Sequence, residues 1–72
     1  MTQERIEELA REVVRTVFTD INENEQQSYF HDLVMKAKHE IVEYHDLDVL
    51  GSESHVRQLI DHHLRGIKES LR

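Results

Sequence analysis

The chain has 72 residues, 15 of them acidic and 9 basic, and its formal net charge is −6. A chain of this length forms one domain, and so small a domain buries only about 60% of the surface that its unfolded chain exposes. The sequence contains no cysteine, which excludes disulfides, thiolate metal sites and cysteine-based catalysis. Its acidic balance argues against binding to nucleic acid or to anionic lipid.

Turn-forming residues are scarce, with two glycines and no proline in the chain. This composition is typical of an all-helical protein, because β-sandwiches and barrels need turn residues about every 8–12 positions. The start of the sequence has no basic and apolar leader, and no stretch approaches the roughly 18 apolar residues of a membrane span. We therefore expect a single cytoplasmic domain over residues 1–72, without membrane contact.

The first predicted helix covers residues 3–21. Its apolar residues recur in steps of three and one, which indicates a helix with one buried face. Thr2 is a suitable N-cap for this helix. The apolar stripe consists of Ile6, Leu9, Ala10, Val13, Val14, Val17, Phe18 and Ile21.

A polar stretch at residues 22–27 separates this helix from the next. Asn24, followed three positions later by Gln27, resembles a capping box. We therefore expect a short turn at residues 22–24 and a second helix over residues 25–45. The predicted buried stripe of this helix consists of Phe30, Leu33, Val34, Ala37, Ile41 and Tyr44.

The second connection, residues 46–52, contains several apolar residues. Leu47, Val49 and Leu50 are too apolar for an exposed loop, so we expect them to fold back over the end of the core. Gly51 suits a left-handed turn position, and Ser52 suits the N-cap of the helix that follows.

The third predicted helix covers residues 53–71. Its stripe consists of Val56, Leu59, Ile60, His63, Leu64, Ile67 and Leu71. Gly66 lies inside this helix, where glycine costs about 1 kcal/mol relative to alanine. We expect another helix to approach closely there; the alternative is that glycine is tolerated near a fraying helix end. Connections this short place successive helices antiparallel. The predicted fold is therefore an all-α, antiparallel up-down-up three-helix bundle.

Four apolar residues lie away from the centre of these stripes, and they predict a surface for self-association. They are Val14, Phe18, Met35 and Val42. A contiguous exposed apolar patch marks an interface, and a small chain gains from the additional burial. We expect a homodimer, for which two-fold symmetry is the commonest arrangement.

A group of carboxylates predicts a second interaction surface, for a partner protein with a basic surface. No lysine or arginine interrupts the group in the sequence, and it consists of Glu40, Glu43, Asp46, Asp48 and Glu53. An acidic surface of this kind attracts basic partners.

The six histidines are candidates for metal binding or pH sensing. His39 with Glu43 resembles a zinc-protease helix only superficially, because the second histidine of that motif is absent. We therefore expect no metal and no cofactor. His63 lies within the apolar stripe of the third helix, where we expect a core or boundary histidine that is hydrogen-bonded to Tyr29 or Tyr44. The alternative is a pH-sensitive position in the core or at an interface.

No nucleophile motif or phosphate-binding loop is present, so we expect a protein that is not an enzyme. The best-supported function is that of a protein–protein interaction module: a regulator, adaptor or inhibitor. One alternative is a small DNA-binding regulator that uses the outer face of the third helix. That face carries Arg57, Gln58, Arg65, Lys68 and Arg72. The other alternative is a histidine-based metal binder or pH sensor.

Overall fold

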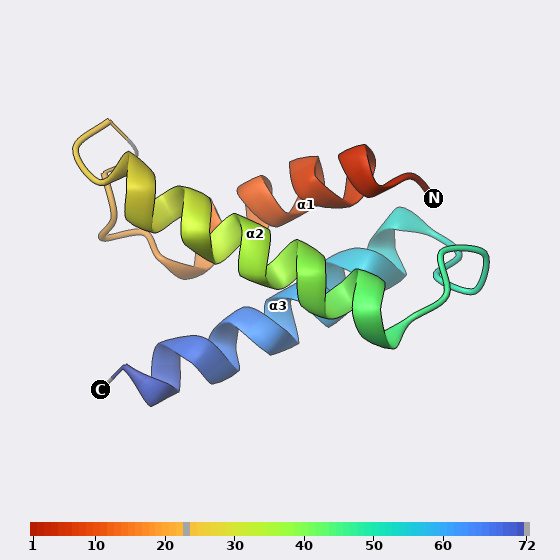
Figure 1. Cartoon of the computed structure of the whole chain (residues 1–72). Coiled ribbons are helices and arrows are strands. Elements are labelled where there is room, and N and C mark those ends of the chain that lie inside the picture. Colours follow the sequence, from red (N-terminus) through yellow and green to blue (C-terminus); the bar gives the residue numbers. More distant parts are fainter. Residues whose placement is uncertain (23, 72) are drawn as a thin grey trace.

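The computed structural model describes residues 1–22 and 24–71, and over these residues it contains three α-helices. They are α1 (Gln3–Val17), α2 (Gln27–Tyr44) and α3 (Glu53–Ser70). Figure 1 shows that each helix reverses the direction of the one before it, and all three pairs of helices are in contact. The predicted up-down-up three-helix bundle is confirmed.

Helix α1 begins where the sequence indicates and ends earlier. The hydroxyl of Thr2 accepts a hydrogen bond from the backbone N–H of Arg5 at 3.2 Å, as expected of an N-cap. The helix stops at Val17 instead of residue 21. Phe18 begins a turn that is closed by the N–H of Ile21 donating to the carbonyl of Phe18 at 3.0 Å. This turn places Ile21 against the edge of the core.

The predicted capping box at the start of α2 is wrong. The N-cap position is Gln26, whose side chain makes no capping hydrogen bond. The turn is held by Asn22, whose carbonyl oxygen accepts from the N–H groups of Glu25 and Gln26 at 3.2 and 2.9 Å. The side chain of Asn22 also accepts from the N–H of Asn24 at 2.9 Å. Because these donors are satisfied from Asn22, helix α2 begins two residues later than predicted.

The connection between α2 and α3 folds back over the core largely as predicted. The carbonyl of Asp46 accepts from the N–H groups of Val49 and Leu50, which forms one hydrogen-bonded turn. Leu50 is 1% exposed and Leu47 is partly buried, whereas Val49 is 74% exposed and points away from the core. Gly51 has φ +69°, which confirms the predicted left-handed position.

Ser52 caps α3, because its hydroxyl accepts from the N–H of His55 at 3.3 Å. Gly66 has open space beside it, since an added Cβ would meet no atom within 4 Å. The expectation that another helix of the same chain approaches closely at Gly66 is therefore wrong. The glycine lies on an exposed part of α3.

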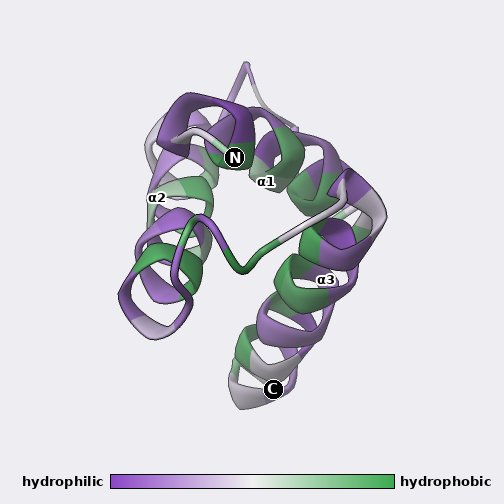
Figure 2. Cartoon of the chain, turned by 90° about the vertical axis from the view of Figure 1, so that its right-hand side faces the viewer, coloured by the Kyte–Doolittle hydropathy of each residue, from purple (hydrophilic) through white to green (hydrophobic). Residues whose placement is uncertain are grey.

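Two of the four residues predicted to lie on an apolar surface belong to the core. Val14 is fully buried and Phe18 is 5% exposed. Helix α1 packs against both α2 and α3, so the full width of its apolar stripe is covered. In Figure 2, α1 lies across the top of the other two helices. An apolar stripe that is too wide to be covered by one neighbouring helix has the width expected of a helix with two neighbours.

Helices α2 and α3 contact each other less extensively than either contacts α1. Figure 2 shows them on either side below α1, with their apolar sides turned toward each other. The line along which these two helices face each other therefore remains partly open to solvent. Within the described residues, none of the helices is long and apolar enough to cross a membrane.

Candidate interaction surface

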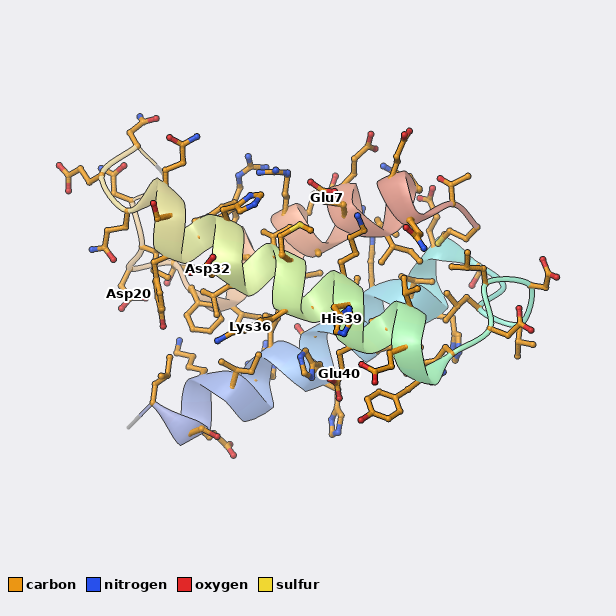
Figure 3. All side chains as sticks on the ribbon, in the orientation of Figure 1. Glu7, Asp20, Asp32, Lys36, His39 and Glu40 are labelled. Carbon is orange, nitrogen blue, oxygen red and sulfur yellow. The ribbon has the colours of Figure 1, made fainter. Side chains whose placement is uncertain are left out.

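The open line between α2 and α3 is bordered on α2 by one row of side chains. The residues Tyr29, Leu33, Lys36, Glu40 and Tyr44 follow one another in steps of four, three, four and four, which places them on one helix face. Figure 3 shows Lys36 and Glu40 on the side of α2 that is turned toward α3. The two tyrosines at the ends of the row are 38% and 68% exposed.

The matching row on α3 consists of Leu59, His63 and Ile67, in steps of four, and continues into Leu71. The first three side chains are partly buried, and Leu71 is 59% exposed. We call the two rows together, from Tyr29 to Tyr44 and from Leu59 to Leu71, the α2–α3 seam. Apolar side chains of this size left half-covered along two facing helices are typical of an interaction surface.

Two hollows lie along the seam. One has a volume of about 210 Å³ and is lined by Glu40, Ile41, Tyr44, His45, Leu59, His62 and His63. The other has a volume of about 350 Å³, lies at the opposite end, and is lined by Phe18, Asp20, Ile21, Gln26, Tyr29, Lys68 and Leu71. The seam is thus incompletely filled by the chain's own side chains at both ends.

Charged side chains of both signs border the seam. Lys36 and Glu40 lie beside it on α2, and Asp20 and Lys68 line the second hollow. Asp32 lies one helical turn before Lys36, and Glu43 lies three positions after Glu40. The exposed edge of α2 beside the seam therefore carries more carboxylates than ammonium groups.

The predicted surface made of Val14, Phe18, Met35 and Val42 does not form. Met35 and Val42 lie on the other edge of α2, where they line a hollow of about 220 Å³ with Gln3 of α1. Val14 and Phe18 are buried and cannot join them. Periodicity along α2 correctly separates Met35 and Val42 from the core stripe, but it cannot show which neighbouring helix lies beside them.

The predicted acidic surface is partly neutralised by α1. The guanidinium of Arg5 donates to both carboxylate oxygens of Glu53 at 2.7 and 2.9 Å. This hydrogen bonding lowers the pKa of Glu53, and the burial that opposes it has a smaller effect. Glu43 lies 3.0 Å from the ring of His39. Arg5 lies 48 positions from Glu53 in the sequence, so no local pattern indicates the pair.

The remaining carboxylates of that group lie close to the connection between α2 and α3. Asp46 accepts from the N–H of Asp48 at 2.9 Å, which orders the turn. Asp46 and Asp48 are exposed, and Glu40 is half-buried beside the seam. The acidic group is thus spread over a helix edge, a turn and an ion pair, and it is not one continuous surface.

The histidines do not converge on a metal site in the described part of the chain, where no group of three potential ligands has suitable geometry. His39 is 79% exposed. His63 is half-buried and lines the first hollow together with Tyr44, so it lies at the boundary of the core and not inside it. His63 lies on the side of α3 that borders the open seam, so water reaches part of its side chain. The pH-sensitive role of His63 stays a prediction.

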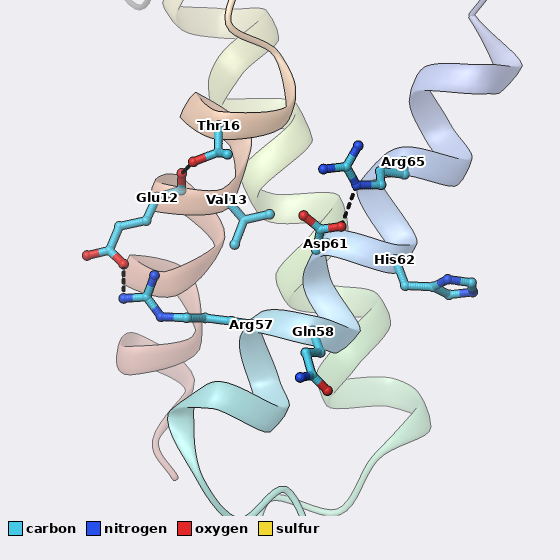
Figure 4. Close-up of a pocket in the computed structure, with 8 residues that line it drawn as sticks. All are labelled: Glu12, Val13, Thr16, Arg57, Gln58, Asp61, His62 and Arg65. Carbon is cyan, nitrogen blue, oxygen red and sulfur yellow. Dashed lines mark hydrogen bonds and ion pairs between the residues drawn. The ribbon is translucent and has the colours of Figure 1, made fainter.

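The alternative of DNA binding depends on the outer face of α3. This face borders a hollow of about 420 Å³ between α3 and α1 (Figure 4). Arg57 forms an ion pair with Glu12 of α1, covering one of its carboxylate oxygens. Arg65 donates to Asp61 at 2.5 Å, and Lys68 donates to the carbonyl of Val17 at 2.8 Å. A phosphate would have to displace these partners. Gln58 lines the same hollow, whereas Arg72 lies outside the described residues.

Glu7 connects α1 to α2 through a shared carboxylate. Lys38 of α2 donates to one of its oxygens at 3.3 Å, and Arg11 donates to the other at 3.2 Å. Hydrogen bonding from Lys38 is the main cause that lowers the pKa of Glu7 below its ordinary value of 4.5, with burial opposing it. A lowered folded-state pKa stabilises the fold above the unfolded value, and the stabilisation is lost as pH falls through the folded value.

We therefore expect Glu7→Gln to lower the free energy of unfolding by about 0.5–1 kcal/mol at pH 7. The loss should shrink as pH falls below 4.5, because the unfolded chain then binds the proton first, and it should disappear once pH has fallen below the lowered pKa of Glu7 in the folded state. Urea denaturation at pH 7 and pH 3 measures both values. Glu25→Gln is the matched control, since Glu25 is exposed in the turn before α2 and should change little. An equal loss at both pH values would contradict the ion-pair explanation.

The serines give no indication of a nucleophile. Ser52 is occupied in capping α3, and Ser70 donates to the carbonyl of Gly66 at 3.0 Å. No protein-family model matches this chain, and no match was found among curated proteins or solved structures.

Proposed function

We propose that this chain is a small acidic protein–protein interaction module, a regulator, adaptor or inhibitor that works as a homodimer through the α2–α3 seam. The observation that carries the proposal is the set of incompletely covered side chains along the seam, which are Tyr29 and Tyr44 on α2 and Leu59, Ile67 and Leu71 on α3. Burying a large apolar side chain completely contributes about 1.5–3 kcal/mol relative to leaving it exposed. A chain of this size has a small core, so the added burial is a large fraction of its stability.

In this proposal the exposed Asp46–Asp48 turn remains available to a second partner with a basic surface. It lies beyond the end of the seam, so dimer formation does not cover it. The alternative of a DNA-binding regulator receives less support, because Arg57, Arg65 and Lys68 already have partners within the chain. A histidine-based pH sensor is supported by three imidazoles around one hollow of the seam, those of His45, His62 and His63.

We expect sedimentation equilibrium between about 1 and 100 μM to give twice the chain mass of 8.6 kDa. Tyr44→Lys should weaken the dimer by about tenfold or more, because it replaces a 68% exposed aromatic side chain of the seam with a strongly hydrated ammonium group. Circular dichroism should show unchanged helix content, since so exposed a position adds little to the core.

Val49→Lys is the matched control. Val49 is also apolar and is 74% exposed, but it lies in the loop away from the seam. This variant adds the same charge and should leave the dimer intact. A wild-type chain that remains at 8.6 kDa at the highest concentration would refute the homodimer.

A further inference from the structure

We infer that the α2–α3 seam binds an amphipathic helix of another protein, one that carries a cation, an anion and a second cation at four-residue spacing beside its apolar face. These three charges pair with Asp32, Lys36 and Glu40 of α2. The inference deepens the proposed function by naming the chemistry of the partner, and it rests on the same seam. A second copy of the chain is the competing occupant.

Three charged side chains follow one another along the edge of α2 beside the seam. Asp32, Lys36 and Glu40 are four residues apart, so they occupy successive turns of the helix over about 12 Å. Figure 3 shows them in this order along α2, and the row ends in the wall of the first hollow, which Glu40 lines. The row therefore presents a carboxylate, an ammonium group and a second carboxylate in alternation.

Within residues 1–22 and 24–71, none of these three side chains forms an ion pair or a hydrogen bond. Other cations of the chain are occupied. Arg57 and Lys38, for example, are both held by carboxylates of α1. An outside partner can therefore pair with the row on α2 without first displacing a group of the chain, which is not true of the cations beside α1.

An incompletely covered apolar surface lies next to the charged row. Tyr44 is 68% exposed, and Leu59 and Ile67 are only partly buried. The edge of α3 that borders the seam follows steps of four, three and four residues and carries no carboxylate, lysine or arginine; it consists of Leu59, His63, Gly66 and Ser70. The partner helix therefore needs charged side chains on only one flank of its apolar face, the flank beside α2.

The arrangement of the three helices leaves room for a fourth. Helix α1 covers α2 and α3 from one side (Figure 2), and these two helices contact each other less than either contacts α1. A helix on the seam would complete a four-helix bundle, in which side chains of facing helices fill the space between them. From Tyr29 to Tyr44 the seam extends about 22 Å along α2, which matches about four turns of a partner helix.

Charge favours such a helix over the other occupants. Beside the seam, Asp32, Glu40 and Glu43 outnumber Lys36, so nucleic acid and anionic lipid are repelled. A second copy brings the same excess of carboxylates and a net charge of −6. A helix with the complementary row is attracted at all three positions, so we expect it to displace the second copy from the seam.

Two synthetic peptides test recognition of the row. Each has the 18-residue length of α2 and the same leucine stripe, and the row beside the stripe is Lys-Glu-Lys in one and Glu-Lys-Glu in the other. We expect the wild-type chain to bind the Lys-Glu-Lys peptide at least about tenfold more tightly, because three attractive pairs replace three repulsive ones. Fluorescence anisotropy of each labelled peptide, titrated with the chain, measures the two Kd values.

The reversed variant D32K/K36E/E40K separates the pattern of the row from the overall charge. Its net charge is −4 instead of −6, since two carboxylates become ammonium groups and one ammonium group becomes a carboxylate. Attraction to an acidic chain would still favour the Lys-Glu-Lys peptide. Recognition of the row instead reverses the preference, so that the Glu-Lys-Glu peptide binds at least about tenfold more tightly.

Asp48→Lys is the matched control, because it also has a net charge of −4 but changes an exposed side chain in the loop beyond the seam. It should keep the preference of the wild type. Circular dichroism checks the helix content of each variant. If the reversed variant loses helix content, D32N/E40Q, which again has a net charge of −4, takes its place and should lose the preference for either peptide.

The outcomes separate this inference from the proposed homodimer. A reversed preference in D32K/K36E/E40K, with the wild-type preference retained in Asp48→Lys, establishes the row. The inference is overturned if the wild type binds neither peptide, if all variants prefer Lys-Glu-Lys, or if Asp48→Lys loses the preference. Sedimentation of the chain without peptide decides the homodimer independently. A chain that stays at 8.6 kDa and still discriminates the peptides by their rows refutes the homodimer and keeps the partner helix.

Discussion

Replacing Phe18 with alanine is expected to lower the free energy of unfolding by about 3–5 kcal/mol. Phe18 is 5% exposed, and its ring also lies 5.8 Å from the ammonium of Lys68, which is bound to the carbonyl of Val17. The substitution removes the ring from the core and leaves a cavity, and it also removes the contact with Lys68. Small domains have total stabilities of about 5–15 kcal/mol, so the variant should be close to unfolding.

Thermal denaturation followed by circular dichroism tests this expectation. Each kcal/mol shifts the Tm of a domain of this size by about 4–8 °C, so Tm should fall by more than about 10 °C. Met35→Ala is the matched control, because Met35 is half-exposed beside α1 and should lose much less stability. If Phe18 lay on an interface, as its place in the sequence predicts, its replacement would instead weaken association and leave the stability of the monomer unchanged.

Replacing Leu50 with alanine is expected to cost about 2–5 kcal/mol, although Leu50 lies in a connection between helices. Its side chain is 1% exposed and belongs to the core cluster. The turn closed on the carbonyl of Asp46 positions it over the end of the bundle. Urea denaturation should show a lower midpoint with a similar dependence on urea concentration, as expected when stability changes and compactness does not.

Val49→Ala is the comparison for Leu50→Ala. The two residues are adjacent and both apolar, but Val49 is 74% exposed. Its replacement should change the free energy of unfolding by no more than about 0.5 kcal/mol. Equal losses for the two variants would mean that the loop does not close the core in solution in the way the structure describes.

Local patterns predicted the helices and most of their ends. The caps at Thr2 and Ser52 and the left-handed turn at Gly51 depend on the backbone within a few residues, so the residue types near them are sufficient. The early end of α1 was less predictable, because the apolar period continues through Phe18 to Ile21. A turn can bring both side chains to the core as well as a helix can.

The candidate surface was only partly predictable. Periodicity places Tyr44 in the predicted stripe of α2, and the same is true of Leu59 and Ile67 in α3. Periodicity does not show that these side chains stay partly exposed, because their exposure depends on how closely α2 and α3 pack against each other. His63 is the same case, because the sequence predicts either a core or a boundary position and the structure places it at the boundary, beside the seam. The pair of Arg5 and Glu53 joins positions 48 residues apart and leaves no local signal.

The sequence by itself determined that the chain is all-helical, where its helices lie and which side of each is apolar. These properties follow from the 3.6-residue period and from short-range hydrogen bonds. Only the tertiary structure decided that α1 meets two neighbours, which buries Val14 and Phe18, and that α2 and α3 contact each other less than either contacts α1, which leaves the seam partly uncovered. The period of a helix defines the direction of a face, but the number of neighbours on that face depends on interhelical angles. Those angles are set by side-chain packing between segments far apart in the chain.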